Sequence, residues 1–280
     1  MDSEGPLLAA ILPCPGRYRA PHSSSARLRH SHVRLSVNEF HSFIQDIHLA
    51  AEMARDELAR RDTLRPHIDT SRSIPLPFVG GGDIRLVVLG QDPTIKNEAS
   101  RENIRTVLNL DKPGALRRYI EQIAKALGLE LENVYATNVC KHFFRNPPSV
   151  ILKSHGQNVL QQGSELTLPI LQRELARFAD ATVVSLGEPV LSALVCNGGS
   201  LFVRVYWGYD EPRRMMSAIP ARHSRLERTI YPLPHQPALR LHFYKSNLDQ
   251  FLRFIRQDAE RAALSSHQAP MREAVREPHE

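Results

Sequence analysis

The stretch Ile84–Pro93 reads IRLVVLGQDP and carries the clearest strand pattern in the chain. Its apolar residues run without interruption from Leu86 to Leu89 and include two β-branched valines, which is typical of a strand buried on both faces. A glycine, an amide, an acid and a proline follow directly. We therefore expect a buried strand that delivers Gln91 and Asp92 at its carboxyl end.

Further apolar runs and helical patterns alternate along the chain. Four runs have the length of a buried strand, namely Ile84–Leu89, Val134–Val139, Thr182–Leu186 and Thr229–Leu233. Helical spacing covers Ser36–Arg61, Pro113–Gly128, Ser164–Phe178, Gly187–Val195 and a last helix that starts at Ser246. Alternation of this kind predicts βαβ units. The expected fold class is α/β, a three-layer αβα arrangement around a mainly parallel sheet of about four strands.

The composition is that of a globular protein with one main domain. The chain has 280 residues, of which 42% are hydrophobic and 24% charged, with a formal net charge of +6. A basic surface is compatible with a polyanionic partner. Residues 1–35 and 263–280 are polar and lack periodicity. We expect disordered tails there, with a single α/β domain over residues 36–262.

Cysteine spacing and hydropathy exclude several classes of protein. The three cysteines are widely spaced, without a C-x-x-C pair, which argues against a disulfide framework, a zinc site or an iron–sulfur cluster. No apolar run is long enough to span a membrane, and the short run Leu7–Leu12 lacks the basic start of a signal peptide. We expect a cytoplasmic monomer without a metal or a cofactor.

Polar residues lie at the ends of three of the predicted strands. Asp92 follows the first, Asn138 lies near the end of the second and His235 follows the fourth. Ligands of parallel sheets bind beyond the carboxyl ends of the strands, so these side chains are candidates for one shared site. Each residue also has a purely structural alternative. Asp92 can form a turn, Asn138 can hydrogen-bond a neighbouring loop, and His235 can be a surface or packing residue.

Three segments resemble motifs of the uracil-DNA glycosylase superfamily. Gly90-Gln91-Asp92-Pro93 is similar to its first motif, and Pro234-His235-Gln236-Pro237-Ala238-Leu239 to its second, histidine-containing motif. The strand Tyr135–Val139 resembles the segment that presents the asparagine which reads uracil. The resemblance extends over about Ile84–Ile255. It implies a monofunctional DNA N-glycosylase of base excision repair that binds DNA and releases uracil or a related damaged base.

The resemblance also implies roles for individual residues. Catalysis is assigned to Asp92 and His235, and base binding to Gln91, Asn138 and Phe143. DNA contacts are assigned to Lys141, Arg145, Arg222 and Leu239. The residue that stacks on the base is open among Leu110, Phe143 and Phe144. Leu239 fits either a wedge in the duplex or the core, and each basic residue fits either a phosphate contact or a solvated loop.

The chain departs from the best-known branch of that family at one informative position. Thr94 stands where an aromatic residue blocks the methyl group of thymine, so the substrate is open among uracil, mismatched thymine and another damaged base. Two other functions stay in competition. One is a catalytically inactive protein of the same fold that binds a nucleobase or DNA, and the other is a hydrolase of free nucleotides that uses Asp92 and His235 as acid and base.

Overall fold

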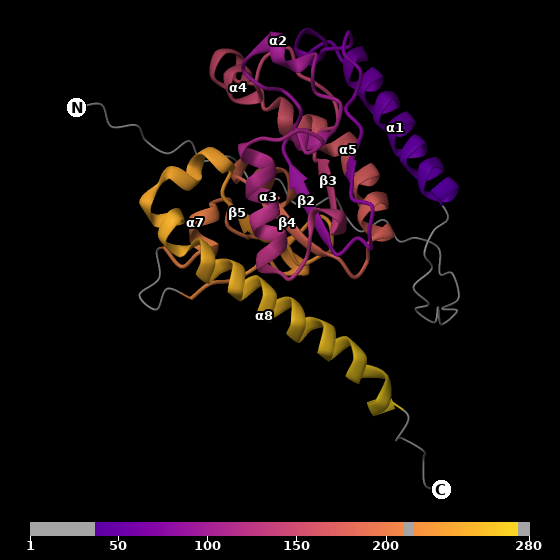
Figure 1. The fold of residues 1–280 in the computed structure, drawn as a ribbon. Helices are drawn as coiled ribbons and strands as arrows, with labels where there is room; N and C mark the ends of the chain where they lie inside the picture. The colour runs from indigo at the N-terminus through magenta and orange to yellow at the C-terminus, as the bar shows by residue number, and fades with distance from the viewer. Residues whose placement is uncertain (1–36, 210–214, 274–280) are drawn as a thin grey trace, which may run out of the picture.

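A five-stranded sheet forms the centre of the molecule in the computed structural model, which describes residues 37–209 and 215–273 (Figure 1). The strand order is β1-β3-β2-β4-β5. The strands are β1 (Phe78–Val79), β2 (Leu86–Gly90), β3 (Val134–Asn138), β4 (Thr182–Leu186) and β5 (Tyr231–Leu233). Four of them run parallel, and β1 pairs antiparallel with β3. The predicted α/β class with a mainly parallel sheet is confirmed.

The edge strand β1 was not predicted, and the expected number of about four strands is corrected to five. This strand has only two residues, and both are half-buried. A segment this short has no alternation of apolar and polar residues by which it could be recognised. The central strands behave in the opposite way, because all five residues of β2 and of β3 are buried. The unbroken apolar run of β2, and the apolar and β-branched residues at the start of β3, made these strands predictable.

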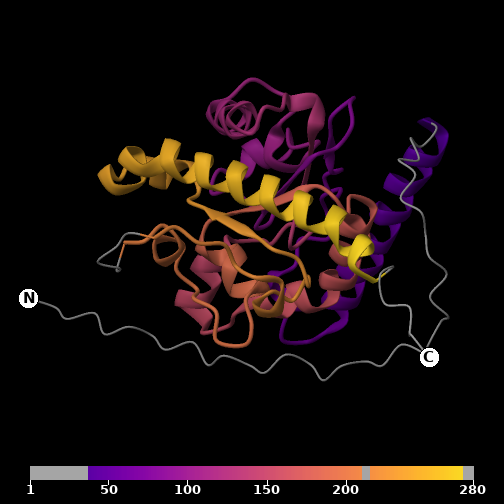
Figure 2. The same cartoon turned by 90° about the horizontal axis from the view of Figure 1, so that it is seen from below.

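Helices cover the sheet on both of its faces (Figures 1 and 2). Helix α3 packs against α8, whereas α5 packs against α6 and carries α1 along its outer side. The α-helices are α1 (Val37–Arg60), α2 (Glu98–Arg101), α3 (Ala115–Ala126), α4 (Pro148–His155), α5 (Val159–Arg177), α6 (Glu188–Leu194), α7 (Val203–Tyr206) and α8 (His242–Glu273). Short 3₁₀ helices occur at η1 (Arg65–His67), η2 (Val107–Asn109), η3 (Leu131–Asn133), η4 (Ala221–His223) and η5 (Gln236–Arg240).

The last helix differs from the prediction at both ends. It begins at His242 rather than at Ser246, and the amide of Lys245 already donates to the carbonyl of Leu241. The aromatic ring of Phe251 stacks on Trp207 with 4.4 Å between ring centroids, which anchors the helix to the core. The helix extends to Glu273, past the domain boundary expected at residue 262. Of the tails expected over 1–35 and 263–280, residues 1–35 and 274–280 lie outside the described residues.

Membrane insertion finds no support among the helices of residues 37–209 and 215–273. None of them combines the length and the apolar character that a bilayer span requires.

Candidate active site

The carboxyl ends of the parallel strands bring three predicted residues to the same edge of the sheet. Gly90, the last residue of β2, pairs with Asn138, the last residue of β3. Leu186 at the end of β4 pairs with Leu233 at the end of β5. Asp92 lies just beyond β2 and His235 just beyond β5. An acid, an amide and an imidazole therefore come from three separate strands to one edge, as expected for a ligand site of a parallel sheet.

Asp92 is held in a turn that embeds its carboxyl group. The amide of Thr94 donates to Asp92 Oδ2 at 2.9 Å. Burial raises the pKa of Asp92 to about 6, and this effect is opposed by hydrogen bonds from Thr94, the charge of Arg101 and a hydrogen bond from Gln91. The residue nevertheless remains partly exposed. A carboxylate that is embedded, ionised near neutral pH and still reachable has the properties of a catalytic group.

Asn138 places an unpaired acceptor in the protein interior. Asn138 is only 1% exposed, and its Oδ1 has no hydrogen-bond partner among the residues that the structure describes. Native proteins pair nearly all such buried acceptors, because leaving one unpaired costs about 1 to 3 kcal/mol. An unpaired acceptor at the end of a strand is a candidate to accept a hydrogen bond from a ligand.

Gly90 is required by the position of the Asn138 side chain. A Cβ atom at Gly90 would lie 2.3 Å from Asn138 Oδ1 and 2.8 Å from Leu108 Cδ2. Both distances are far below van der Waals contact, so any larger residue would displace the amide. The glycine that opens the Gly-Gln-Asp-Pro motif therefore makes room for the asparagine of the neighbouring strand.

Leu108 borders this part of the site and was not predicted. Its backbone is left-handed, with φ 57° and ψ 8°, and Asn109 follows with φ 55°. A leucine in this region is strained, and such strain is concentrated at functional sites. Leu108 has the same apolar character as its neighbours Val107 and Leu110, so its residue type does not mark it. Only its backbone conformation does. The candidates proposed for stacking, Leu110, Phe143 and Phe144, are at most 2% exposed.

His235 lies against the end of β4. A Cβ atom at Gly187, whose φ is +87°, would lie 3.2 Å from the Cβ of His235. The hydroxyl of Tyr119 on α3 donates to the carbonyl of Pro234 at 3.3 Å and so fixes the residue that precedes the histidine. Partial burial of the imidazole lowers the pKa of His235, although the residue as a whole is exposed. The imidazole is therefore neutral at pH 7 and can donate one ring N–H.

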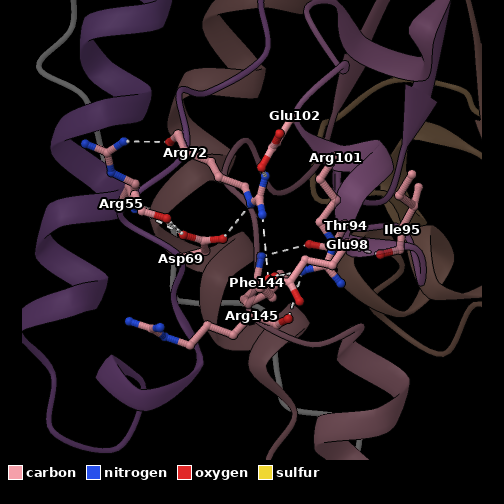
Figure 3. Close-up of polar contacts among 11 residues, drawn as sticks. Arg55, Asp69, Arg72, Thr94, Ile95, Glu98, Arg101, Glu102, Phe144 and Arg145 are labelled. Carbon is pink, nitrogen blue, oxygen red and sulfur yellow. Dashed lines mark hydrogen bonds and ion pairs between the residues drawn. The ribbon is translucent and has the colours of Figure 1, made fainter.

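Hydrogen bonds join the segment after Asp92 to the segment after Asn138 (Figure 3). The amide of Phe144 donates to Thr94 Oγ1 at 2.8 Å. The guanidinium of Arg101, the last residue of α2, donates to main-chain carbonyls on both segments. The amide of Cys140 also donates to the carbonyl of Gln91 at 2.9 Å. These contacts hold the two segments in a fixed relation.

Lys141 is not available to DNA, which corrects its assignment as a phosphate contact. It is 5% exposed and forms a short ion pair with Glu174 of α5. Its Nζ also donates to Thr137 Oγ1 at 2.5 Å. All of its interactions are directed into the layer between β3 and α5. Its partner Glu174 lies far along the sequence, so the pattern near Asn138 does not indicate the pairing.

The remaining predicted residues are not equally placed for a site at this edge. Gln91 is half-buried beside Asp92, and Arg145 is exposed in the segment after β3. Phe143 is 2% exposed, so it has no free face for a base. Arg222 is exposed but does not lie at this edge of the sheet. Its carbonyl accepts a hydrogen bond from Asn197, which follows the C-terminal end of α6, whereas Gly187 precedes the N-terminal end of that helix. Leu239 in η5 is half-buried and packs against the main core.

Metal ligation is not indicated by the part of the chain that the structure describes. Within it, no group of three or more His, Cys, Asp or Glu residues could hold a metal ion. The side chains described above act as hydrogen-bonding groups and charges.

One comparison with known proteins assigns the chain to a family. A family model described as the uracil DNA glycosylase superfamily matches residues 77–258. The matched range includes the sheet and each of the residues Asp92, Asn138 and His235. No curated protein matches the chain.

Proposed function

This chain belongs to the uracil-DNA glycosylase superfamily, and from that premise we propose that it is a monofunctional DNA glycosylase of base excision repair. Its substrate is uracil, or a related damaged base, flipped out of DNA. The observation that carries the proposal is the unpaired, buried Oδ1 of Asn138 at the edge to which Asp92 and His235 are also delivered. The unpaired Asn138 acceptor lowers stability unless a ligand binds to it, and the raised pKa of Asp92 at the same edge is a further property of functional sites.

Asn138 supplies the choice of base. Its Oδ1 accepts from uracil N3–H, and its Nδ2 donates to uracil O4. Cytosine presents the opposite polarity at both positions and would leave buried groups unpaired, which costs roughly 1 to 3 kcal/mol for each group. The base must leave the helical stack to reach an amide this deep in the protein. Gly90 keeps the space that this amide occupies.

Asp92 and His235 stabilise the opposite charges that develop as the glycosidic bond breaks. The bond between the sugar C1′ and the base nitrogen cleaves with its electron pair on the base. The Asp92 carboxylate favours the cationic sugar and orients the water whose oxygen bonds to C1′ and whose proton is released. Neutral His235 donates its ring N–H to the O2 side of the departing anion. Both interactions strengthen toward the transition state, so each raises the rate of the chemical step.

Exposed cations along the segments that follow the strand ends are the proposed phosphate contacts. Lys96 follows Asp92, Arg145 follows Asn138 and Arg240 follows His235, and all three are exposed. Each phosphate contact contributes to a salt-dependent affinity. Loss of one such contact lowers the slope of log affinity against log salt by about 1.

A base-release assay tests the proposal. Single- and double-stranded oligonucleotides carrying uracil, a G·T mismatch or a deaminated purine are incubated with the wild type and with Asp92→Asn, and abasic sites are revealed by alkaline cleavage. We expect abasic sites from uracil-containing DNA with the wild type only. Equal DNA capture by both proteins without abasic sites would indicate a binding protein, and salt-independent turnover of free nucleotides would indicate a nucleotide hydrolase.

A further inference from the structure

Arg101 is a buried arginine whose guanidinium contacts main-chain oxygens of two different segments. The residue is 3% exposed. Its Nε donates to the carbonyl of Ile95 at 2.7 Å, and its Nη1 donates to the carbonyls of Arg145 at 2.8 Å and Phe144 at 3.3 Å (Figure 3). The first acceptor lies in the segment after Asp92, and the other two lie in the segment after Asn138. One side chain therefore fastens the two segments to each other.

The charge of Arg101 has no carboxylate partner of its own. Within residues 37–209 and 215–273, no carboxylate forms an ion pair with this guanidinium. The neighbouring Arg72 differs, because it pairs with Asp69 at 3.0 Å and with Glu98 at 3.6 Å (Figure 3). Burial of a cation without a counter-ion is costly. The carboxyl group on which the charge of Arg101 acts is that of Asp92.

We propose that Arg101 is a positioning residue for the glycosylase reaction, which fixes the Asp92 segment against the segment after Asn138 and sets a positive charge near the Asp92 carboxylate. The inference rests on the proposed function, since it takes Asp92 as a catalytic group. No motif indicates this role, because Arg101 lies well beyond the Gly-Gln-Asp-Pro segment in the sequence.

The groups around Asp92 determine the expected effect of pH. They are Thr94 and Gln91 on its own segment, Arg101 at the end of α2, and the Cys140 thiol, which follows β3. Burial raises the pKa of Asp92 to about 6, and the charge of Arg101 holds it below the value that burial alone would impose. Removal of that charge raises the pKa further. Because the ionised carboxylate is the active form, the rising limb of the activity profile then moves to higher pH.

Three variants separate the charge of Arg101 from its hydrogen bonds. Arg101→Gln removes the charge, Arg101→Lys keeps the charge but loses the forked geometry, and Arg105→Gln removes an exposed arginine of the same segment as a control. Two measurements are made on each: kcat and KM for a uracil-containing oligonucleotide across pH, and the pKa of Asp92 from the ¹³C NMR titration of its carboxyl carbon, assigned with Asp92→Asn.

We expect Arg101→Gln to move the rising limb of the profile to higher pH, which lowers kcat severalfold on the acid side of the limb and changes KM little. Arg101→Lys is expected to keep the Asp92 pKa near that of the wild type and to lower kcat severalfold at all pH values. Arg105→Gln should match the wild type in both measurements.

The proposal is overturned if folded Arg101→Gln titrates like the wild type, or if Arg101→Lys matches the wild type in kcat at every pH. Should Arg101→Gln fail to fold, Arg101→Lys decides through kcat alone. A wild type that releases no base from any substrate contradicts the proposed function instead. In that case the NMR titration still shows whether Arg101 acts on Asp92, so the two failures are distinguishable.

Discussion

Strand β3 carries two buried polar clusters, and they differ in how completely their hydrogen bonds are satisfied. Tyr135 and Thr137 point to one face, where Glu174 accepts from their hydroxyls at 2.6 and 2.9 Å and pairs with Lys141. Asn138 points to the other face, as residues of a strand alternate. Its Oδ1 has no partner and lies against Gly90. Thr137 thus belongs to a closed cluster with Tyr135, Lys141 and Glu174, in which the hydrogen bonds are satisfied. Asn138 lies with Gly90 in an open cluster, in which an acceptor is unpaired.

The difference separates structure from function on physical grounds. A buried network in which each member has a partner contributes rigidity and needs no ligand. A buried acceptor without a partner lowers stability until something binds, so it is retained where binding is its purpose. Burial alone does not distinguish Lys141 from Asn138, since both are nearly inaccessible. The state of their hydrogen bonds does.

The largest effect is expected from opening the closed cluster. Glu174→Gln leaves the buried Lys141 without a counter-ion, so the free energy of unfolding should fall by about 3 to 5 kcal/mol in urea denaturation. The double variant Lys141→Met with Glu174→Leu removes both charges but leaves the Tyr135 and Thr137 hydroxyls without their acceptor, so it should regain only part of that loss. A Glu174→Gln protein as stable as the wild type would show that the ion pair is not a structural element.

The next effect concerns catalysis by Asp92, which follows β2 at the same edge of the sheet as Asn138. Asp92→Asn should lower kcat for uracil release at pH 8 by at least about 10²-fold, equivalent to about 2.7 kcal/mol of transition-state stabilisation. In the wild type, kcat should rise with pH through the Asp92 pKa of about 6 and then level off. Asp249→Asn, an exposed acid on α8, is the matched control and should leave the profile unchanged.

The same substitution is expected to stabilise the fold. Burial raises the folded-state pKa of Asp92 to about 6 from an ordinary value of 3.8. The carboxyl is therefore more easily protonated in the folded state, and stability is lost as pH rises through this window. Above pH 7, Asp92→Asn should increase the free energy of unfolding by about 1 to 3 kcal/mol, the lower part of this range reflecting the partial exposure of the residue.

Urea denaturation of Asp92→Asn and the wild type at a series of pH values measures this stabilisation. The two proteins should converge below about pH 3, where the acid is protonated in both folded and unfolded states. A difference in stability that does not depend on pH would mean that the ionised carboxylate is not what burial destabilises.

The sequence was sufficient for the features that depend on residue type along a single segment. Strands β2, β3 and β4 are fully or almost fully buried and rich in apolar and β-branched residues, so their patterns predict them directly. Asp92 and Asn138 were predicted because they follow or end those runs. Strand β1 was not predicted, because a segment of two residues is too short to show a periodic pattern.

Features that depend on distant partners or on backbone conformation were not predictable. Lys141 follows the Asn138 strand as a phosphate-binding lysine would, and its partner Glu174 lies on helix α5, far along the sequence. Phe143 was a reasonable stacking residue by type, but the fold turns it inward. Neither the residue type nor the local sequence pattern marks Leu108 or Arg101 as functional. Their importance comes from a left-handed backbone in one case and from main-chain contacts in the other.

The smallest expected effect compares neighbouring residues on the two faces of β3 by near-isosteric apolar replacement. Thr137→Val removes a hydroxyl that donates to Glu174 and accepts from Lys141, so it should lower the free energy of unfolding by about 1 to 3 kcal/mol. Asn138→Leu removes an acceptor that has no partner, so its stability should equal or exceed that of the wild type by up to about 1 kcal/mol. Urea denaturation at a single pH measures both. Equal losses in the two variants would mean that the Asn138 amide is satisfied in solution, and the distinction between an open and a closed cluster would then fail.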